Sequence, residues 1–116
     1  MGALKIFVDG SGKYGAYCYL VDGGKPRIFL KGHLTNNQAE YKAIIAALQE
    51  LPGKELAIHS DSQLAVRQLN GEYQIKDPQL RGLADQVLML CENRLVTFRW
   101  IPREENLAGK VLEKLV

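Results

Sequence analysis

The sequence has few of the residues that form disulfides, zinc sites or membrane spans. It contains two cysteines, Cys18 and Cys91, in separate apolar segments and without zinc-ligand spacing, and only two histidines. We therefore expect free thiols in a reducing compartment. No apolar run approaches the roughly 18 residues that a membrane helix needs, and no signal-peptide segment follows Met1. These absences favour a cytoplasmic protein without a membrane partner.

The chain also has little excess charge of either sign. Fifteen lysines and arginines stand against 13 acidic residues, for a formal charge of +2, while hydrophobic residues make up 47%. This composition predicts a soluble globular protein with one domain over residues 1–116. The weak positive charge permits a nucleic-acid partner without indicating one. Four basic residues could follow a phosphate backbone or simply face solvent: Arg67, Lys76, Arg81 and Arg103.

The periodicity of the apolar residues predicts five strands and four helices. The strands are expected at 4–8, 14–21, 27–32, 55–59 and 95–101, and the helices at 37–51, 62–69, 78–92 and 104–115. Short turns between the first three strands indicate an antiparallel meander, and helical crossovers indicate that the first, fourth and fifth strands are parallel. The sequence therefore predicts an α/β fold with a five-stranded mixed sheet flanked by helices.

Three acidic residues occupy positions that such a sheet would bring together. Asp9 ends the first strand, Asp61 follows the fourth, and Glu40 lies in the first turn of the helix that connects them. Ligands of α/β sheets bind beyond the carboxyl ends of the parallel strands. Mg²⁺ prefers oxygen ligands, and two such ions can stabilise both the attacking and the leaving oxygen of a phosphodiester. The pattern indicates a divalent-metal site that acts on phosphates.

Each acid has a simpler interpretation when it is taken alone. Asp9 before a glycine is typical of a turn. Glu40 could be an exposed residue favoured by the helix dipole, and Asp61 could cap the helix that begins at Ser62. The conjunction of all three favours the metal site.

Four segments together resemble type 1 ribonuclease H: DGS at 9–11, TNNQAEYKA at 35–43, SDSQLAVRQLNGEYQIK at 60–76 and IPREEN at 101–106. The likeness covers essentially the whole chain, and its length resembles compact bacterial and archaeal members. It implies a ribonuclease H-like fold, binding of RNA–DNA hybrids, and cleavage of the RNA strand with two Mg²⁺ or Mn²⁺ ions. The matched metal ligands and catalytic residues are Asp9, Glu40 and Asp61.

The resemblance also implies which residues bind nucleic acid. Asn36 and Asn37 match residues that contact the minor groove, Thr35 matches a DNA-phosphate contact, and Gly10 and Ser11 match part of the RNA-strand surface. A wide, shallow minor groove can accept short amides. Thr35 could equally cap a helix with Gln38 as its capping-box partner, and both asparagines could be ordinary loop and cap residues. Tyr73 and Trp100 could stack on bases, although packing is the expectation for Trp100.

Two features depart from the family pattern. The family carries a fourth acidic ligand near the C-terminus, where this chain has Gly109, and glycine supplies no oxygen. Glu105 and Glu113 lie about one helical turn away, so direct replacement is not expected. The loop after Asp9 is also shorter than usual, which removes backbone donors to the hybrid.

Two functional hypotheses follow from these sequence features. The first is a monomeric endoribonuclease, attenuated at its second metal. The second is a hybrid-binding module that has lost catalysis.

Overall fold

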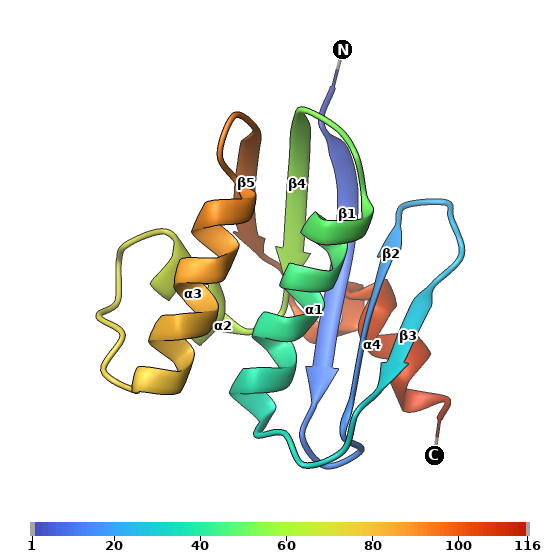
Figure 1. The fold of residues 1–116 in the computed structure, drawn as a ribbon. Coiled ribbons are helices and arrows are strands. Elements are labelled where there is room, and N and C mark those ends of the chain that lie inside the picture. The colour runs from blue at the N-terminus through green and yellow to red at the C-terminus, as the bar shows by residue number, and fades with distance from the viewer. Residues whose placement is uncertain (1, 116) are drawn as a thin grey trace.

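Five strands form one mixed sheet in the order β3-β2-β1-β4-β5 (Figure 1). The computed structural model describes residues 2–115. The strands are β1 (Leu4–Ser11), β2 (Ala16–Val21), β3 (Arg27–Leu30), β4 (Glu55–Ser60) and β5 (Leu95–Trp100). The helices are α1 (Asn36–Glu50), α2 (Gln63–Leu69), α3 (Pro78–Leu90) and α4 (Leu107–Glu113), with a 3-10 turn, η1, at Arg103–Glu105.

The pairing of the strands confirms the predicted topology. β2 pairs antiparallel with both β1 and β3, whereas β4 pairs parallel with both β1 and β5. The carboxyl ends of β1, β4 and β5 therefore lie at one edge of the sheet. This edge carries the residues that follow β1 and β4, as the sequence predicts.

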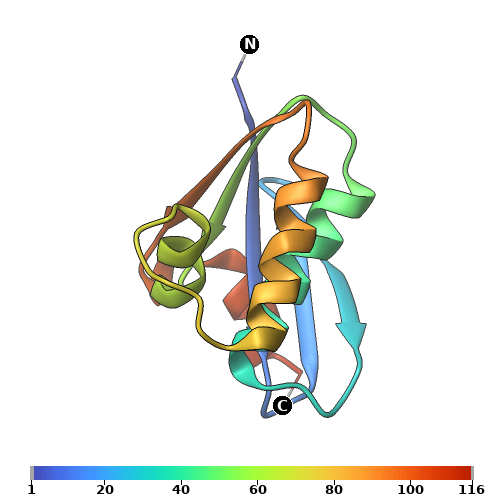
Figure 2. The same ribbon diagram turned by 60° about the vertical axis from the view of Figure 1, so that its left-hand side comes forward.

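Helices cover both faces of the sheet (Figure 2). α1 and α3 pack on one face over the larger core, which includes Ile6, Tyr41, Ile44 and Ile58, each no more than 1% exposed. Burying an aliphatic side chain of this size contributes about 1.5–3 kcal/mol, so α1 is held mainly by this face. α4 packs on the opposite face against β1 and β2, and Leu112 is buried there.

Local sequence explains where the helices begin. Thr35 caps α1 through its side chain, which accepts a hydrogen bond from the N–H of Gln38, and the Gln38 side chain accepts one in return from the N–H of Thr35. This confirms the capping box. Asp77 caps α3, with proline at the first helical position. Both caps satisfy backbone donors that have no partner within the helix.

The prediction of the C-terminal helix is wrong in one respect. Instead of a continuous helix over 104–115, the chain forms η1, passes through Asn106 in an extended conformation, and then begins α4. The Asn106 side chain accepts a hydrogen bond from the N–H of Ala108, so it caps α4. Glu105 therefore does not lie on the same helix as Gly109.

β1 is also longer than predicted, because Asp9, Gly10 and Ser11 continue to pair with β2.

Arg94 connects several backbone segments at the end of the sheet opposite the carboxyl ends of the parallel strands. Its guanidinium donates to the carbonyl oxygens of Leu48, Leu51, Gly53 and Leu90 at 2.8, 2.5, 2.9 and 3.4 Å. These carbonyls belong to the ends of α1 and α3 and to the loop before β4. One cation thus satisfies acceptors left open where two helices end.

Among residues 2–115, no helix is long and apolar enough to cross a membrane.

Candidate functional site

Three carboxylates meet at the edge of the sheet where β1 and β4 end. One oxygen from each of Asp9, Glu40 and Asp61 lies within 4.8 Å of the others. Asp9 is 4% exposed and Glu40 is 6% exposed, while Asp61 is partly buried. The structure therefore brings together all three acids that the sequence singles out.

The simpler interpretations of these acids do not fit their positions. Asp9 lies within β1 and pairs with Cys18, so it does not form the turn. Glu40 is buried in the second turn of α1 and is not an exposed first-turn residue. Ser62, not Asp61, caps α2, because the Ser62 hydroxyl accepts the hydrogen bond from the N–H of Ala65 at 3.2 Å. None of the three carboxylates is therefore explained by a local backbone role.

Gly10 allows β1 to approach α1 closely enough to form this cluster. A Cβ atom at residue 10 would lie 2.3 Å from the carbonyl carbon of Ala39 and 2.5 Å from the backbone nitrogen of Glu40. Only glycine avoids that clash. The N–H of Gly10 donates to Oε1 of Glu40 at 3.1 Å. Because this donor is already used, Gly10 acts in this structure by placing Glu40 beside Asp9.

Asn106 orients the third carboxylate and was not identified from the sequence. Its side chain is fully buried, and Nδ2 donates to the carbonyl of Val8 at 2.9 Å and to Oδ2 of Asp61 at 3.1 Å. Since Oδ1 caps α4, one amide joins β1, Asp61 and the last helix. An asparagine directly before a helical apolar pattern is a capping signal that could have drawn attention to this residue.

Trp100 contacts the same acid from the end of β5. Its Nε1 donates to the backbone carbonyl of Asp61 at 3.2 Å, and the side chain is 46% exposed. This contact is compatible with the expected packing role, although the exposed fraction excludes Trp100 from the buried core. Trp100 fixes the backbone of Asp61 while leaving much of its ring accessible.

The electrostatics of the cluster favour a cation. Burial first, and then the neighbouring charge of Asp61, raise the pKa of Asp9 to about 7. Burial and the charge of Asp9 raise the pKa of Glu40 well above its usual range. Carboxylates held this close repel one another until a proton or a metal ion neutralises them. An oxygen-rich, electron-rich cluster of this kind fits a hard divalent ion such as Mg²⁺ or Mn²⁺.

Gly109 faces the cluster from α4. A Cβ atom at this residue would lie 3.4 Å from Oδ2 of Asp9 and 3.7 Å from Oδ2 of Asp61, which is ordinary contact. A cavity of about 110 Å³ adjoins it, lined by Asp9, Gly10, Ser11, Tyr14, Asn36, Arg103, Gly109, Leu112 and Glu113. Arg103 lines the same cavity, and its charge opposes the rise in the pKa of Asp9. Arg103 and Glu113 also form an exposed ion pair at 3.7 Å.

The predicted nucleic-acid residues differ in accessibility, and three of them, Gly10, Ser11 and Asn36, line the cavity beside Asp9. Thr35, Asn36 and Asn37 are exposed at the start of α1, whereas Gly10 is buried and Ser11 is partly buried. Asn36 accepts a hydrogen bond from the N–H of Gly12 at 2.8 Å, which ties the loop after β1 to α1. Among the predicted nucleic-acid residues, the exposed ones are therefore those at 35–37.

The sequence and the fold both match known proteins. Residues 20–115 match a family described as reverse transcriptase-like. The bifunctional protein Rv2228c of Mycobacterium tuberculosis is 38% identical over 79 residues, which cover 65% of this chain and 22% of that protein. The chain thus matches a small part of that relative.

Solved structures of other proteins superpose on nearly the whole of this chain. The N-terminal RNase H domain of Rv2228c, solved as a fusion with maltose-binding protein, superposes with a TM-score of 0.83 at 30% identity, covering 95% of each chain. RNase H1 of Halobacterium salinarum gives 0.86 at 29% identity, covering 96% of this chain and 94% of that one. LC11-RNase H1, isolated from compost and solved with an RNA/DNA hybrid, gives 0.82 at 28% identity, covering 94% and 92%.

Proposed function

Because this chain belongs to the reverse transcriptase-like family, and its solved relatives are ribonuclease H domains, we propose that it is an endoribonuclease that cleaves the RNA strand of RNA–DNA hybrids. The observation that carries the proposal is the convergence of Asp9, Glu40 and Asp61 within 4.8 Å. A hydrolase of this kind would act as a monomeric, cytoplasmic enzyme.

The three carboxylates would hold the divalent ions, Mg²⁺ or Mn²⁺. Bound ions of this kind stabilise negative charge on a phosphate and make water more acidic. Asp9 and Asp61 are positioned by different parts of the fold, through the pairing of β1 and through Asn106 and Trp100 respectively. Such fixed ligands need little rearrangement when substrate binds, which favours catalysis.

Residues 35–37 would recognise the hybrid. The Asn36 and Asn37 amides can donate and accept in a wide minor groove, and Thr35 lies exposed at the N-terminus of α1, where backbone N–H groups favour a phosphate. Ser11 and Gly10 would border the RNA strand. The N–H of Gly10 contributes indirectly by holding Glu40.

The glycine at residue 109 leads us to expect a reduced rate of cleavage. Two ions are expected for the reaction, and residue 109 offers no oxygen to the second one. A hybrid-binding module without catalysis is therefore the alternative function, since the surface at residues 35–37 does not depend on Gly109.

The test is cleavage of a hybrid whose RNA strand is labelled, with Mg²⁺ and Mn²⁺ in separate reactions. The Asp9→Asn variant is compared with Asp22→Asn, which changes an exposed aspartate in the β2–β3 turn. We expect products with 3′-hydroxyl and 5′-phosphate ends, lost in Asp9→Asn and retained in Asp22→Asn. Hybrid binding without cleavage in either metal would establish the alternative, and absence of both would contradict both functions.

A further inference from the structure

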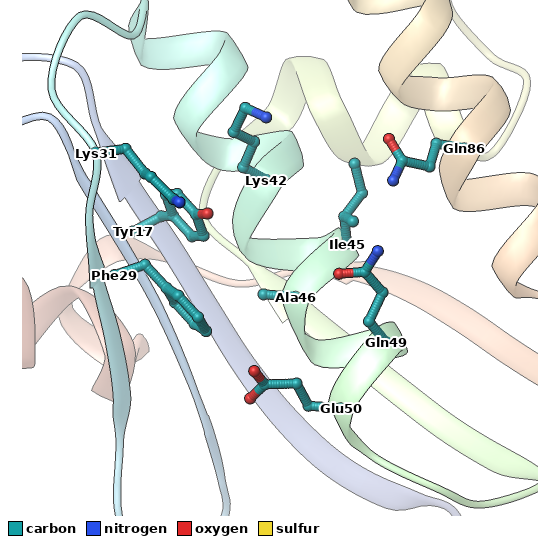
Figure 3. A pocket seen from close by; sticks show the side chains of 9 residues that line it. All are labelled: Tyr17, Phe29, Lys31, Lys42, Ile45, Ala46, Gln49, Glu50 and Gln86. Atoms are coloured by element: carbon teal, nitrogen blue, oxygen red, sulfur yellow. The ribbon is translucent and has the colours of Figure 1, made fainter.

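A second groove lies on the α1 face of the sheet, away from the carboxylate cluster (Figure 3). It has a volume of about 370 Å³ and lies between α1, α3 and the β2–β3 edge. It is lined by Tyr17, Phe29, Lys31, Lys42, Ile45, Ala46, Gln49, Glu50 and Gln86. None of these residues lines the cavity beside Asp9. The groove is therefore a separate candidate site.

Tyr17 brings a hydroxyl group to this groove. The residue is only 7% exposed, and its hydroxyl forms no hydrogen bond within residues 2–115. Because no fully buried side-chain oxygen or nitrogen in this range lacks a partner, this hydroxyl reaches the solvent in the groove. The two other buried tyrosines differ, because Tyr19 donates to Glu50 at 2.6 Å and Tyr41 donates to Gln68 at 2.8 Å. A hydroxyl that reaches solvent in this way can exchange its water for a polar atom of a ligand. Tyr17 thus offers a hydrogen bond to whatever enters the groove.

Two cations lie at the same end of the groove. The Lys31 side chain, from the segment after β3, ends beside the Tyr17 hydroxyl, and Lys42, from α1, lines the same end of the groove with its ammonium directed away from the ring (Figure 3). Glu50 lies at the opposite end. Within residues 2–115, neither lysine forms an ion pair. Two free ammonium groups and a hydroxyl donor favour an anion.

The negative charge of Glu50, the one carboxylate that lines the groove, is already balanced by an ion pair with Arg27. Glu50 accepts hydrogen bonds from Nε and Nη2 of Arg27 at 2.9 and 2.8 Å and from the Tyr19 hydroxyl. These partners, with the Arg27 guanidinium first, lower the pKa of Glu50 to about 2. The charge of Glu50 is therefore balanced by Arg27, and the charge at the lysine end remains positive.

The walls of the groove suit a planar group. The Phe29 ring stacks on Tyr17 with centroids 5.0 Å apart and an interplanar angle of 13°. Ala46 and Ile45 form an apolar floor, and the amides of Gln49 and Gln86 supply polar contacts farther along. Pockets for small ligands typically enclose about 300–1,000 Å³, so this volume admits one nucleotide-sized molecule.

We propose that this groove binds a phosphorylated ligand of mononucleotide size. The phosphate would be held by Tyr17, Lys31 and Lys42, and the planar part would lie near Phe29. The phosphate could belong to a free nucleotide or to a nucleic-acid strand bound by the protein, and the two sources share this chemistry. The site goes beyond the proposed cleavage activity and does not depend on it.

The experiment is an NMR titration of the full chain with AMP, with adenosine as the ligand that lacks phosphate. EDTA is present throughout, so that phosphate cannot bind through a metal at the carboxylates. We expect saturable shifts at Tyr17, Phe29 and Lys31 with AMP and binding of adenosine at least about tenfold weaker. Lys31→Ala and Lys42→Ala should each weaken AMP binding at least about fivefold, and Tyr17→Phe about threefold. Lys25→Ala, at an exposed lysine in the β2–β3 turn, should change nothing.

A second arm distinguishes the source of the phosphate. Binding of a short RNA–DNA hybrid is measured in EDTA by fluorescence anisotropy for the wild type, Lys31→Ala and Lys25→Ala. A selective loss in Lys31→Ala, with competition by AMP, assigns the site to a nucleic-acid phosphate. AMP binding without any effect of Lys31→Ala on hybrid affinity assigns it to a free nucleotide.

Three outcomes would overturn the proposal. These are the absence of saturable shifts with either ligand, equal binding of adenosine and AMP, and equal weakening by Lys25→Ala. Neither arm uses metal or measures cleavage, so failure of this site and failure of the endoribonuclease proposal remain distinguishable.

Discussion

The Cβ position of Gly109 lies 3.4 Å from Oδ2 of Asp9. Asp61 is nearly as close, at 3.7 Å from its Oδ2. Both distances are ordinary contacts, so a side chain can begin at residue 109 without displacing the backbone. Residue 109 is thus the point on α4 from which an added carboxylate would reach the existing cluster.

Gly109→Asp should strengthen metal binding and raise the Mg²⁺-supported rate of hybrid cleavage. An added oxygen ligand would face the same ions as Asp9 and Asp61. Without metal, the extra charge would repel its neighbours, so the melting temperature in EDTA should fall relative to Gly109→Ala. The alanine variant should itself gain about 0.5–1 kcal/mol from helix propensity, without any gain in metal affinity. Calorimetric titration with Mn²⁺ and thermal melting in EDTA measure both effects. Equal metal affinity in the two variants would place the missing ligand elsewhere.

The stability of the metal-free protein should fall as the pH rises. The folded pKa of Asp9 is raised to about 7, above the ordinary value of 3.8, so the folded state binds its proton more tightly than the unfolded state does. This stabilisation is complete below the unfolded pKa and is lost as the pH rises through the folded pKa. Between about pH 5 and pH 8, the free energy of unfolding should decrease by about 2–3 kcal/mol from Asp9 alone.

Glu40 contributes in the same direction, because its pKa is also raised. Urea unfolding at several pH values in EDTA measures the slope. Asp9→Asn should flatten this slope, and saturating Mg²⁺ should restore stability at the alkaline end, because metal replaces the lost protons. A free energy of unfolding that rises with pH in EDTA would contradict the raised pKa values of Asp9 and Glu40.

Asn106→Ser should reduce metal affinity more than a helix-cap change alone would. Serine can still cap α4, but it cannot also donate to Val8 and Asp61 as the amide does. We expect a loss of about 1–3 kcal/mol in unfolding free energy, since the Val8 carbonyl remains buried without its donor. Mn²⁺ affinity should fall several-fold. Asn70→Ser is the control, because Asn70 donates only to the Phe98 carbonyl and is exposed. Unchanged Mn²⁺ affinity in Asn106→Ser would limit Asn106 to a structural role.

Arg94→Ala should destabilise the fold without changing metal affinity. The variant leaves the carbonyls of Leu48, Leu51, Gly53 and Leu90 without the guanidinium, and we expect a loss of about 2–4 kcal/mol. Arg81→Ala provides the contrast, because the Arg81–Asp85 pair is exposed and should contribute less than about 1 kcal/mol. Chemical denaturation measures both, and comparable losses in the two variants would contradict the special role of Arg94.

Much of the fold could be predicted from local patterns in the sequence. The alternation of apolar residues and the turn signals located all five strands, and the crossovers fixed which of them are parallel. Because parallel strands end at a common edge, the convergence of Asp9 and Asp61 followed from the topology. The capping box at Thr35 was likewise visible, since it depends only on residues three apart.

Features that depend on distant atoms could not be predicted in this way. The cap at Asn106 is a local signal, but the bonds of its amide to Val8 and Asp61, which are 98 and 45 residues away in the sequence, are not. The exposure of Trp100 follows from its place at the edge strand β5, which no local pattern reveals. Gly10 was noted as part of a motif, but its steric role appears only when α1 is packed against β1.

The bonds of Arg94 and the carboxylate cluster lie at opposite edges of the same sheet. The ends of α1 and α3 are thus stabilised away from the carboxylates, and Asp9, Glu40 and Asp61 are not members of the hydrophobic core clusters. At the site itself, residue 109 has room for a side chain, whereas Gly10 and Asn106 do not tolerate replacement so easily. We therefore expect that an acidic side chain can be gained or lost at residue 109 without loss of the fold.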